Sequence, residues 1–374
     1  MKKKILVLYA EYGSGHKSIA EYVAKYIIGH NQKCEVMLLN LTTFATFPGK
    51  VGLNVMKFVG KYRPEKIFDF CYSVSDHRVV AKGSKMFGVK SFDNKYARKV
   101  ITDFNPDITI STQFYCSNVI SYYNKKGLIN SKLITIITDY HSHEVWTINH
   151  KEEDGFIVGN EIIKKELIKR GVPKKKIYSF GLPLINKKNI GNKMFIKSKY
   201  GIKNNRKVIL FFGGSSTGSM YYFNYLKVLA KIRLDINLIF VSGNNERLRK
   251  KSEELVKKEK LINWTILGYT TDVFNLYRIS DLVITKPGGA TVTECLEFKC
   301  PMLLVPGVGG QEKHNAKFIE KKKYGIYVKN RYRFKKVINQ ILNNDKLLNT
   351  FNEKLDKQDE NKSLELINSL IKKM

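Results

Sequence analysis

Residues 285–294 read Thr-Lys-Pro-Gly-Gly-Ala-Thr-Val-Thr-Glu, and this stretch decides how the second half of the chain is organised. The apolar residues 282–284 before it predict a strand that runs into a glycine turn, with a helix opening at Ala290. A second strand, expected over 302–305, runs into a similar turn at 306–312. Two helix N-termini are therefore expected side by side at one edge of a parallel sheet. Free backbone N–H groups and the helix dipole make such a place an anion site, most often for phosphate.

Side chains around these two turns suit a diphosphate flanked by two sugars. Thr291 and Glu294 lie one turn apart on a helix, so a hydroxyl could bond a phosphate while a carboxylate accepts from paired sugar hydroxyls. Gln311 and Glu312 stand at the mouth of the second turn, where they could hold further hydroxyls. The candidate binding residues here are Pro287, Gly288, Gly289, Ala290, Thr291, Glu294, Gln311 and Glu312.

These residues resemble the motif Thr-Lys-Pro-Gly-Gly-x-Thr-x-x-Glu, followed by Pro-Gly-Gln-Glu, of the monogalactosyldiacylglycerol synthases and processive diacylglycerol glucosyltransferases. The likeness extends from Ile5 to about Gly325. The second element departs slightly, because residues 306–312 read Pro-Gly-Val-Gly-Gly-Gln-Glu. The resemblance to this group within glycosyltransferase family 28 implies a GT-B α/β fold. Two doubly wound, Rossmann-like parallel-sheet domains would face a central cleft, with a UDP-sugar on the C-terminal domain.

The chain is long enough for two α/β domains, with 374 residues of which 43% are apolar. We expect an N-terminal domain over 1–182, a linker over 183–199 and a C-terminal domain over 200–374. The last helix is expected to pack back on the first domain. Short β-branched runs alternate with helical patterns and predict parallel strands at 5–9, 35–39, 108–111, 133–138, 155–158, 208–212, 238–241, 264–267, 282–284 and 302–305.

Several classes of protein are disfavoured by composition. No apolar run approaches the roughly 18 residues of a membrane-spanning helix, and the apolar stretch 5–10 is too short for a signal peptide. Five cysteines without a Cys-x-x-Cys pair argue against a disulfide framework and favour reducing cytosol. The seven scattered histidines predict no metal site.

The loop of residues 11–16, Glu-Tyr-Gly-Ser-Gly-His, follows the first strand. Its spelling fits neither a Walker phosphate loop nor a dinucleotide fingerprint. A helix N-terminus disfavours an imidazolium, so His16 is expected to be neutral, as a general base must be. The resembling family has Gly-x-Gly-His here, which implies that His16 acts on the acceptor hydroxyl with Gly15 close by. The alternative is a histidine that merely caps its helix.

Residues 138–146 follow another strand and look like the family segment Thr-Asp-x-x-x-His-x-x-Trp. The resemblance implies that Asp139 orients His16 or contacts the acceptor, although it could also cap the loop. His143 and Trp146 are expected at the acceptor mouth. In the second domain, Gly214 and Ser215 follow a strand and are candidates for diphosphate or acceptor contact. Tyr269 and Thr270 stand where relatives hold uracil, although Tyr269 could equally be a core residue.

The formal net charge of +33 calls for an anionic neighbour or reflects lysine-rich composition alone. The segment 50–62 predicts a helix with an apolar face that includes Phe58 and a basic face of Lys50, Lys57 and Lys61. Such a helix could lie on an anionic membrane, because the family takes a lipid acceptor, or could pack on its own domain. No ladder of aromatic and basic residues suits nucleic acid.

The resemblance as a whole implies an inverting transfer of a hexose to diacylglycerol. The donor would be UDP-glucose or UDP-galactose, without a cofactor or divalent cation, at the cytoplasmic face of the cell membrane. The alternative is N-acetylglucosamine transfer to a polyprenyl-diphosphate peptidoglycan precursor. A nucleotide-sugar epimerase and a basic nucleic-acid-binding protein fit the motifs less well.

Overall fold

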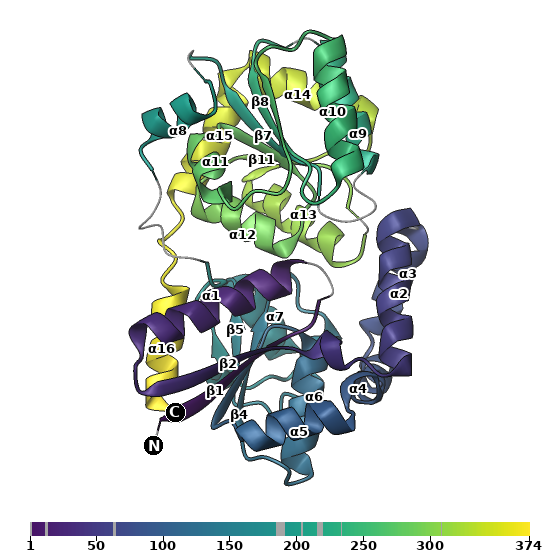
Figure 1. The fold of residues 1–374 in the computed structure, drawn as a ribbon, viewed down its shortest axis with the longest axis vertical. Helices are drawn as coiled ribbons and strands as arrows, with labels where there is room; N and C mark the ends of the chain where they lie inside the picture. The colour runs from purple at the N-terminus through teal and green to yellow at the C-terminus, as the bar shows by residue number, and fades with distance from the viewer. Residues whose placement is uncertain are drawn as a thin grey trace. The chain divides into compact units, whose positions relative to one another are not determined.

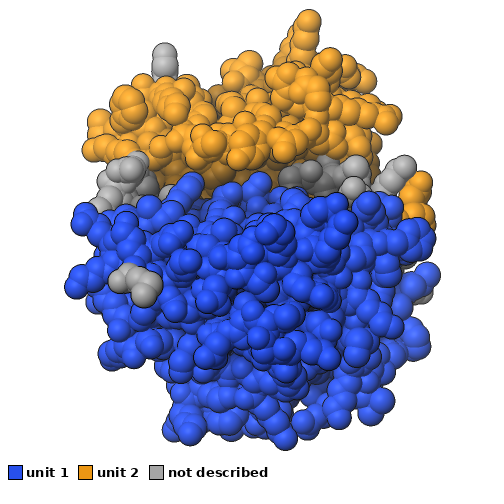
Figure 2. Space-filling model, turned by 60° about the horizontal axis from the view of Figure 1, so that its bottom comes forward, with its two compact units in different colours: residues 1–56, 66–185, 360–374 blue, residues 57–65, 186–359 orange. Residues whose placement is uncertain are grey.

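The computed structural model describes residues 2–11, 14–62, 65–184, 191–202, 205–214, 220–232, 234–307 and 309–374. Within helices, the side chains of residues 14, 56, 57, 59–61, 65 and 66 lie outside this description. The chain divides into two compact units (Figure 2). Unit 1 comprises residues 1–56, 66–185 and 360–374, and unit 2 comprises residues 57–65 and 186–359.

Unit 1 is built on a six-stranded sheet in the order β2-β1-β3-β4-β5-β6, with every pair parallel. The central strands are buried on both faces, so β1 reads as a continuous apolar run from its third residue, and the polar residues Thr109, Ser111 and Thr135 of β3 and β4 are buried as well. The strands are β1 (Lys3–Tyr9), β2 (Cys34–Asn40), β3 (Ile108–Ser111), β4 (Lys132–Ile137), β5 (Gly155–Val158) and β6 (Ile177–Tyr178).

Helices of unit 1 cover the sheet, and asparagine or glutamine side chains cap several of them (Figure 1). Asn94, for example, accepts from the backbone N–H groups of Tyr96 and Ala97. The helices are α1 (Ser14–His30), α4 (Arg78–Phe92), α5 (Lys95–Phe104), α6 (Phe114–Lys125), α7 (Glu161–Lys169) and α16 (Ser363–Lys373), with 3-10 turns η1 (Leu41–Phe44), η2 (Glu144–Trp146) and η3 (Lys174–Lys176). Helices α2 (Phe47–Tyr62) and α3 (Glu65–Ser75) also belong to unit 1, except for residues 57–65, which fall in unit 2.

Unit 2 contains a second six-stranded parallel sheet, in the order β12-β11-β10-β7-β8-β9. Its strands are β7 (Val208–Phe212), β8 (Asn237–Val241), β9 (Trp264–Leu267), β10 (Leu282–Thr285), β11 (Met302–Leu304) and β12 (Gly325–Tyr327). Its helices are α8 (Lys193–Lys199), α9 (Met220–Ile232), α10 (Glu246–Lys258), α11 (Val273–Ile279), α12 (Gly289–Glu297), α13 (Gln311–Lys322), α14 (Arg331–Asn343) and α15 (Asp345–Asp356).

The two parallel sheets flanked by helices confirm the expected doubly wound α/β class, and the ten strands expected from sequence are all present. Two short edge strands, β6 and β12, were not anticipated, because two or three residues carry too little pattern. Part of the expected linker is helical, since Asn192 caps α8 by accepting from Met194. Only α16 of the helices after Arg331 belongs to unit 1.

The last helix is joined to the start of unit 1 by specific contacts. The Lys3 ammonium donates to the Ile371 carbonyl at 3.2 Å, and Asn31 donates to Asn368 at 3.4 Å. Figure 1 shows α16, in yellow, beside α1. The five cysteines are free thiols, as the sequence predicted. Among the described residues, no helix is both long enough and apolar enough to cross a bilayer.

Candidate functional site

The imidazole of His16 lies where three neighbouring strands of unit 1 end. His16 sits in the first turn of α1, directly after β1, while Thr112 follows β3 and Thr138 follows β4. Its Nδ1 atom is 2.6 Å from the Thr112 carbonyl oxygen and 3.3 Å from the Thr138 hydroxyl. In return, the Thr112 hydroxyl donates to the His16 carbonyl at 3.0 Å. Adjacent strand ends therefore hold the ring and its backbone in one orientation.

These contacts determine the tautomer of the ring. A carbonyl oxygen only accepts hydrogen bonds, so Nδ1 carries the proton and Nε2 keeps its lone pair. Burial lowers the pKa of His16 from 6.5 to about 4, and the hydrogen bond to Thr112 offsets part of that effect. The ring is therefore neutral at pH 7, with Nε2 free to accept a proton.

Trp146, which the sequence analysis assigned to an acceptor mouth, is nearly buried beside this histidine. Only 3% of it is exposed, its ring centroid is 6.5 Å from that of His16, and it meets the Phe114 ring edge-on at 5.6 Å. Gly15 is half-buried in the same first turn of α1. We name His16, Thr112, Thr138 and Trp146 the histidine site.

Asp139 and His143 lie in the segment between β4 and η2 but differ in their surroundings. Asp139 is half-buried, and its charge helps to raise the pKa of the Tyr72 hydroxyl. Thr112 and Thr138 already contact Nδ1 of His16, so the orientation of that ring does not need Asp139. Contact with an acceptor is therefore the role that we predict for Asp139. His143 is buried: its Nε2 is 3.0 Å from the Tyr72 carbonyl, and its Nδ1 accepts from the Val145 N–H at 3.2 Å. His143 thus joins α3 to η2.

An ion-pair network that the sequence did not indicate fixes the same segment. The Arg170 guanidinium donates to Asp76 at 2.9 Å and to Glu144 at 2.8 Å, and Asp76 also accepts from the Glu144 N–H. Burial would raise the pKa of Asp76, but hydrogen bonds from His141, the Glu144 N–H and Arg170 hold it well below its usual range. Glu166 accepts from the Ser142 N–H at 3.0 Å. The loop that carries Asp139 and Trp146 is therefore anchored to α7 and to the end of α3.

The basic and apolar helix expected over 50–62 is α2, and the apolar face expected to be either packed or lipid-facing is largely exposed. Phe58 is 56% exposed, Val51 45% and Val55 53%, so the described apolar side chains of this face are not packed against the rest of the protein. Lys50 is exposed, whereas the side chains of Lys57 and Lys61 lie outside the described residues. Helices α3 and α4 also carry exposed apolar side chains, which the sequence analysis did not single out: Ile67, Phe70, Val79, Met86 and Phe87.

In unit 2, the two glycine turns lie at the ends of adjacent strands, as the sequence predicted. Strand β10 pairs with β11, and α12 begins after Gly288 while α13 begins after Gly310. No side chain caps either helix. Asn315 on α13 donates to the Pro287 carbonyl at 3.0 Å, which ties the second helix to the first turn. The first N–H groups of α12 have no acceptor within their own helix and can receive an anion.

The described side chains at these turns hold two carboxylates in place. Glu294 on α12 is half-buried, and its Oε2 accepts from the Tyr277 hydroxyl at 2.8 Å. Glu312 on α13 is buried and forms an ion pair with Lys286, which directly precedes the first turn. A Cβ added at Gly288 would lie 4.0 Å from Glu312 Oε1, so this carboxylate stands beside the first turn. We name these turns and side chains the glycine-turn site.

The other residues predicted at the two glycine turns are buried or half-buried. Thr291, Gly289, Ala290 and Gln311 are half-buried in the first turns of their helices, and Pro287 is buried. A side chain at Gly307 would collide with the Glu312 carboxylate, so the second turn requires glycine there. Lys286 and Tyr277 were not assigned a role from sequence: the lysine was visible in the motif, whereas no pattern marks the tyrosine.

The other residues of unit 2 that were predicted to bind the substrates follow β7 and β9, at the same edge of the sheet. Gly214 has a positive φ of 78°, and Ser215 lies outside the described residues. Tyr269 is 70% exposed, which overturns the alternative that it is a core residue. Thr270 accepts from the Asp272 N–H at 3.1 Å. Strands β8 and β7 separate β9 from β10, so these two residues line a different part of the sheet edge.

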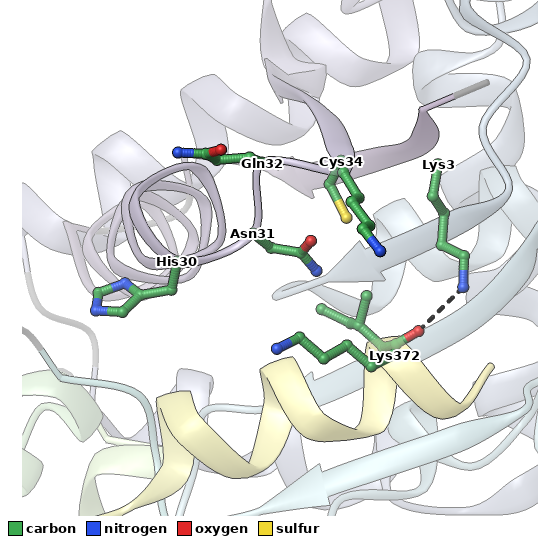
Figure 3. A pocket seen from close by; sticks show the side chains of 8 residues that line it. Lys3, His30, Asn31, Gln32, Cys34 and Lys372 are labelled. Carbon is green, nitrogen blue, oxygen red and sulfur yellow. Dashed lines mark hydrogen bonds between the residues drawn. The ribbon is translucent and has the colours of Figure 1, made fainter.

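A pocket of about 640 Å³ occurs elsewhere in unit 1 (Figure 3). It lies at the start of β1 and the end of α1, and Lys3, His30, Asn31, Cys34 and Lys372 are among its lining residues. His16 follows the other end of β1, so this pocket is separate from the histidine site. Among the described residues, no group of three or more histidine, cysteine or acidic side chains is placed to hold a metal ion.

Two protein families match successive parts of the chain. The monogalactosyldiacylglycerol (MGDG) synthase family matches residues 16–184, and the glycosyltransferase family 28 C-terminal domain matches residues 208–370. The first match contains the histidine site and the second contains the glycine-turn site.

Two relatives are similar over most of the chain. A processive diacylglycerol beta-glucosyltransferase of Bacillus pumilus is 28% identical, over 85% of this chain and 81% of the relative. The protein of that name in Bacillus licheniformis is 26% identical, over 98% of this chain and 92% of the relative.

Solved structures share the fold at lower identity. MurG of Acinetobacter baumannii aligns with a TM-score of 0.65 at 15% identity, over the whole of both chains. The UDP-GlcNAc 2-epimerase of Neisseria meningitidis, bound to UDP-GlcNAc, also gives a TM-score of 0.65, at 12% identity over 99% of this chain and 100% of the epimerase. Both likenesses confirm the GT-B architecture of paired α/β units.

Proposed function

Because the chain belongs to the family of monogalactosyldiacylglycerol synthases and processive diacylglycerol glucosyltransferases, we propose that it transfers glucose or galactose from a UDP-sugar to diacylglycerol. The observation that carries this proposal is the state of His16. Its Nδ1 proton is bonded to the Thr112 carbonyl, its pKa is lowered to about 4 by burial, and Nε2 is the nitrogen left to accept a proton. A hydroxyl acceptor requires such a base.

The reaction is a single displacement at the anomeric carbon. Nε2 of His16 takes the proton of the free diacylglycerol hydroxyl as its oxygen forms the new glycosidic bond. The bond between the anomeric carbon and the diphosphate oxygen breaks, and the electron pair leaves with UDP. Attack from the face opposite the leaving group inverts the anomeric configuration. Asp139 is assigned to contact with the acceptor.

The departing diphosphate is assigned to the glycine-turn site. The N-terminus of α12 offers unpaired backbone N–H groups and the positive end of a helix dipole, which together stabilise developing negative charge. Thr291 is placed to donate its hydroxyl to a phosphate oxygen, Glu294 to accept from the ribose hydroxyls, and Gln311 and Glu312 to bind hydroxyls of the transferred sugar. We therefore expect turnover without a divalent cation, and loss of turnover on adding EDTA would contradict this assignment.

The lipid acceptor is assigned to unit 1, which presents apolar side chains on three consecutive helices. Phe47 is 80% exposed, Phe70 69% and Val79 83%, and such exposure is more than a monomeric soluble surface needs. Exposed Lys50 and Arg78 accompany them, and each cation near anionic lipid contributes about 1 kcal/mol. We propose that α2, α3 and α4 hold the enzyme at the cytoplasmic face of the cell membrane as a peripheral protein.

A transfer assay tests the proposed reaction. The protein is incubated with radiolabelled UDP-glucose or UDP-galactose and vesicles containing diacylglycerol, and the lipids are then separated. Label in a glycolipid is the expected result, and the more efficient donor identifies the sugar. A polyprenyl-diphosphate acceptor supplied with UDP-N-acetylglucosamine serves as the comparison. Label only in that product, or in neither, would contradict the proposal.

A further inference from the structure

We propose that Tyr277 is a positioning residue that holds Glu294 in place for the ribose hydroxyls of the nucleotide donor. This inference rests on the proposed function, because it presumes that a nucleoside diphosphate binds at α12. It concerns a residue to which neither the motif nor the composition gives a role. The geometry that carries it is the 2.8 Å hydrogen bond from the Tyr277 hydroxyl to Glu294 Oε2.

Tyr277 itself is held in one position. Only 1% of it is exposed, its ring stacks on Phe298 with centroids 5.5 Å apart and planes 13° from parallel, and Phe212 packs at 5.5 Å from another side. Its carbonyl accepts from the Cys300 thiol at 3.3 Å. A ring fixed in this way delivers its hydroxyl to one point in space, so the hydrogen bond restricts the rotamer of Glu294.

The hydrogen bond from Tyr277 leaves the Glu294 carboxylate able to accept from the two adjacent hydroxyls of a ribose. With Oε2 engaged by Tyr277, Oε1 is the oxygen that remains to accept from a ligand, and Oε2 keeps a second lone pair. Glu294 is on the second turn of α12, in the helix whose N-terminus is assigned to the diphosphate. A carboxylate locked at this place meets the ribose without losing rotamer entropy on binding.

The same geometry links nucleotide binding to pH. Burial raises the pKa of Glu294 to about 7, and the hydrogen bond from Tyr277 acts in the opposite direction. The other titratable groups that interact with Glu294 are the Tyr277 hydroxyl and the Cys295 thiol, and burial raises the pKa of each well above its usual value, so neither changes charge near pH 7. Only the ionised carboxylate accepts from both ribose hydroxyls. Affinity should therefore rise as pH rises through about 7, and removing the tyrosine hydroxyl should move that rise to higher pH.

Calorimetric titration with two nucleotides tests the inference. UDP and its 2′,3′-dideoxy analogue are titrated into the wild type, Tyr277→Phe and Glu294→Gln at pH 6, 7 and 8. The dideoxy analogue keeps the diphosphate and lacks the ribose diol, so it reports the titration of the phosphates alone. Tyr225→Phe is the matched control, because it removes another buried hydroxyl of unit 2, which lies 3.1 Å from that of Tyr221. Thermal melting checks that each variant folds.

We expect Tyr277→Phe to weaken UDP about tenfold at pH 7, as the loss of a hydrogen bond to a charged group would, and to leave the dideoxy analogue within twofold. The wild type should bind UDP about tenfold more tightly at pH 8 than at pH 6, after subtraction of the dideoxy series. Equal weakening of both nucleotides by Tyr277→Phe, or no weakening, overturns the positioning role. Absence of any UDP binding by the wild type instead overturns the proposed function.

Discussion

The histidine site of unit 1 and the glycine-turn site of unit 2 both follow parallel strands, but the first holds a neutral base and the second holds oriented carboxylates. In unit 1, burial keeps His16 neutral, and one ring nitrogen is bound to a backbone carbonyl so that the other is free. In unit 2, two carboxylates are each held by a neighbouring side chain, Glu294 by the Tyr277 hydroxyl and Glu312 by the Lys286 ammonium.

This contrast separates two chemical tasks. A base must be neutral before it reacts, and a ring with a lowered pKa keeps that state over the whole physiological range. A residue that recognises hydroxyl groups must be an oriented acceptor, and a fixed hydrogen-bond donor orients it without any proton transfer. Proton removal and nucleotide recognition should therefore respond separately to mutation.

The largest expected effect comes from His16→Ala. Loss of the base should lower kcat by about 10²–10⁴-fold, while the dissociation constant for UDP stays within twofold of the wild type. Transfer kinetics and calorimetry measure the two quantities. His30→Ala is the control, because that ring lies at the other end of α1, stacked on Tyr26. If UDP binding fell as much as kcat, the division between the two sites would be wrong.

Lys286→Met tests the second carboxylate of the glycine-turn site. Glu312 is buried, and removing the Lys286 cation takes away an ion pair that orients this carboxylate, which should raise KM for the UDP-sugar about tenfold. Lys317→Met, on the exposed face of α13, should change nothing. Adding Glu312→Gln to Lys286→Met removes the buried negative charge and should recover any folding stability that the single variant loses, though not sugar recognition. An unchanged KM in the single variant would mean that Glu312 needs no orientation.

Membrane attachment is a third function, which we assign to the helices α2, α3 and α4 and to neither binding site. Phe70→Ser combined with Val79→Ser should lower binding to anionic vesicles about thirtyfold, since each apolar side chain inserted into lipid contributes about 1 kcal/mol. Reversing the charges of Lys50, Lys57 and Lys61 should weaken binding further in low salt. Tyr332→Ser, at an 84% exposed position of unit 2, is the control. Vesicle sedimentation that is the same for all variants would remove the assignment.

The smallest expected effect concerns a buried carboxyl of unit 1 outside both sites. Glu153 is 1% exposed, and burial raises its pKa from 4.5 to about 8. Between these values the folded protein binds the proton more tightly than the unfolded chain, so this group makes stability fall as pH rises. Glu153→Gln should be the more stable protein at pH 8.5, by on the order of 2 kcal/mol, and should lose that advantage at pH 5.

Thermal unfolding of both proteins across this pH range measures the effect. Glu161→Gln, at an exposed position in the first turn of α7, should match the wild type at each pH. A wild-type curve that stays parallel to that of Glu153→Gln would show that the buried carboxyl does not titrate in this window.

Much of the architecture was predictable because buried parallel strands leave continuous apolar runs. The ten strands and the two glycine turns follow from that pattern and from the glycine pairs that end the runs, Gly288 with Gly289 and Gly309 with Gly310. Strand β6 was not predicted, because two residues are too few to show a repeating pattern of apolar side chains. The helical start of the linker at α8 depends on a single asparagine cap.

The partners of the site residues were not predictable from local sequence. Thr112 meets His16 from 96 positions away, and Arg170 meets Asp76 from 94 positions away, so only the order of the strands brings them together. No sequence motif marks Tyr277, because its proposed role depends only on where its buried ring places the hydroxyl in the folded protein. Lys286 was visible in the motif, but its pairing with Glu312 depends on the neighbouring turn.

The most direct test of the account is a calorimetric titration of the wild-type protein with UDP, once in EDTA and once in Mg²⁺. The account assigns the diphosphate to backbone N–H groups at the start of α12, so it predicts measurable binding with the same affinity in both solutions. No heat in either solution, or binding only when Mg²⁺ is present, would contradict it.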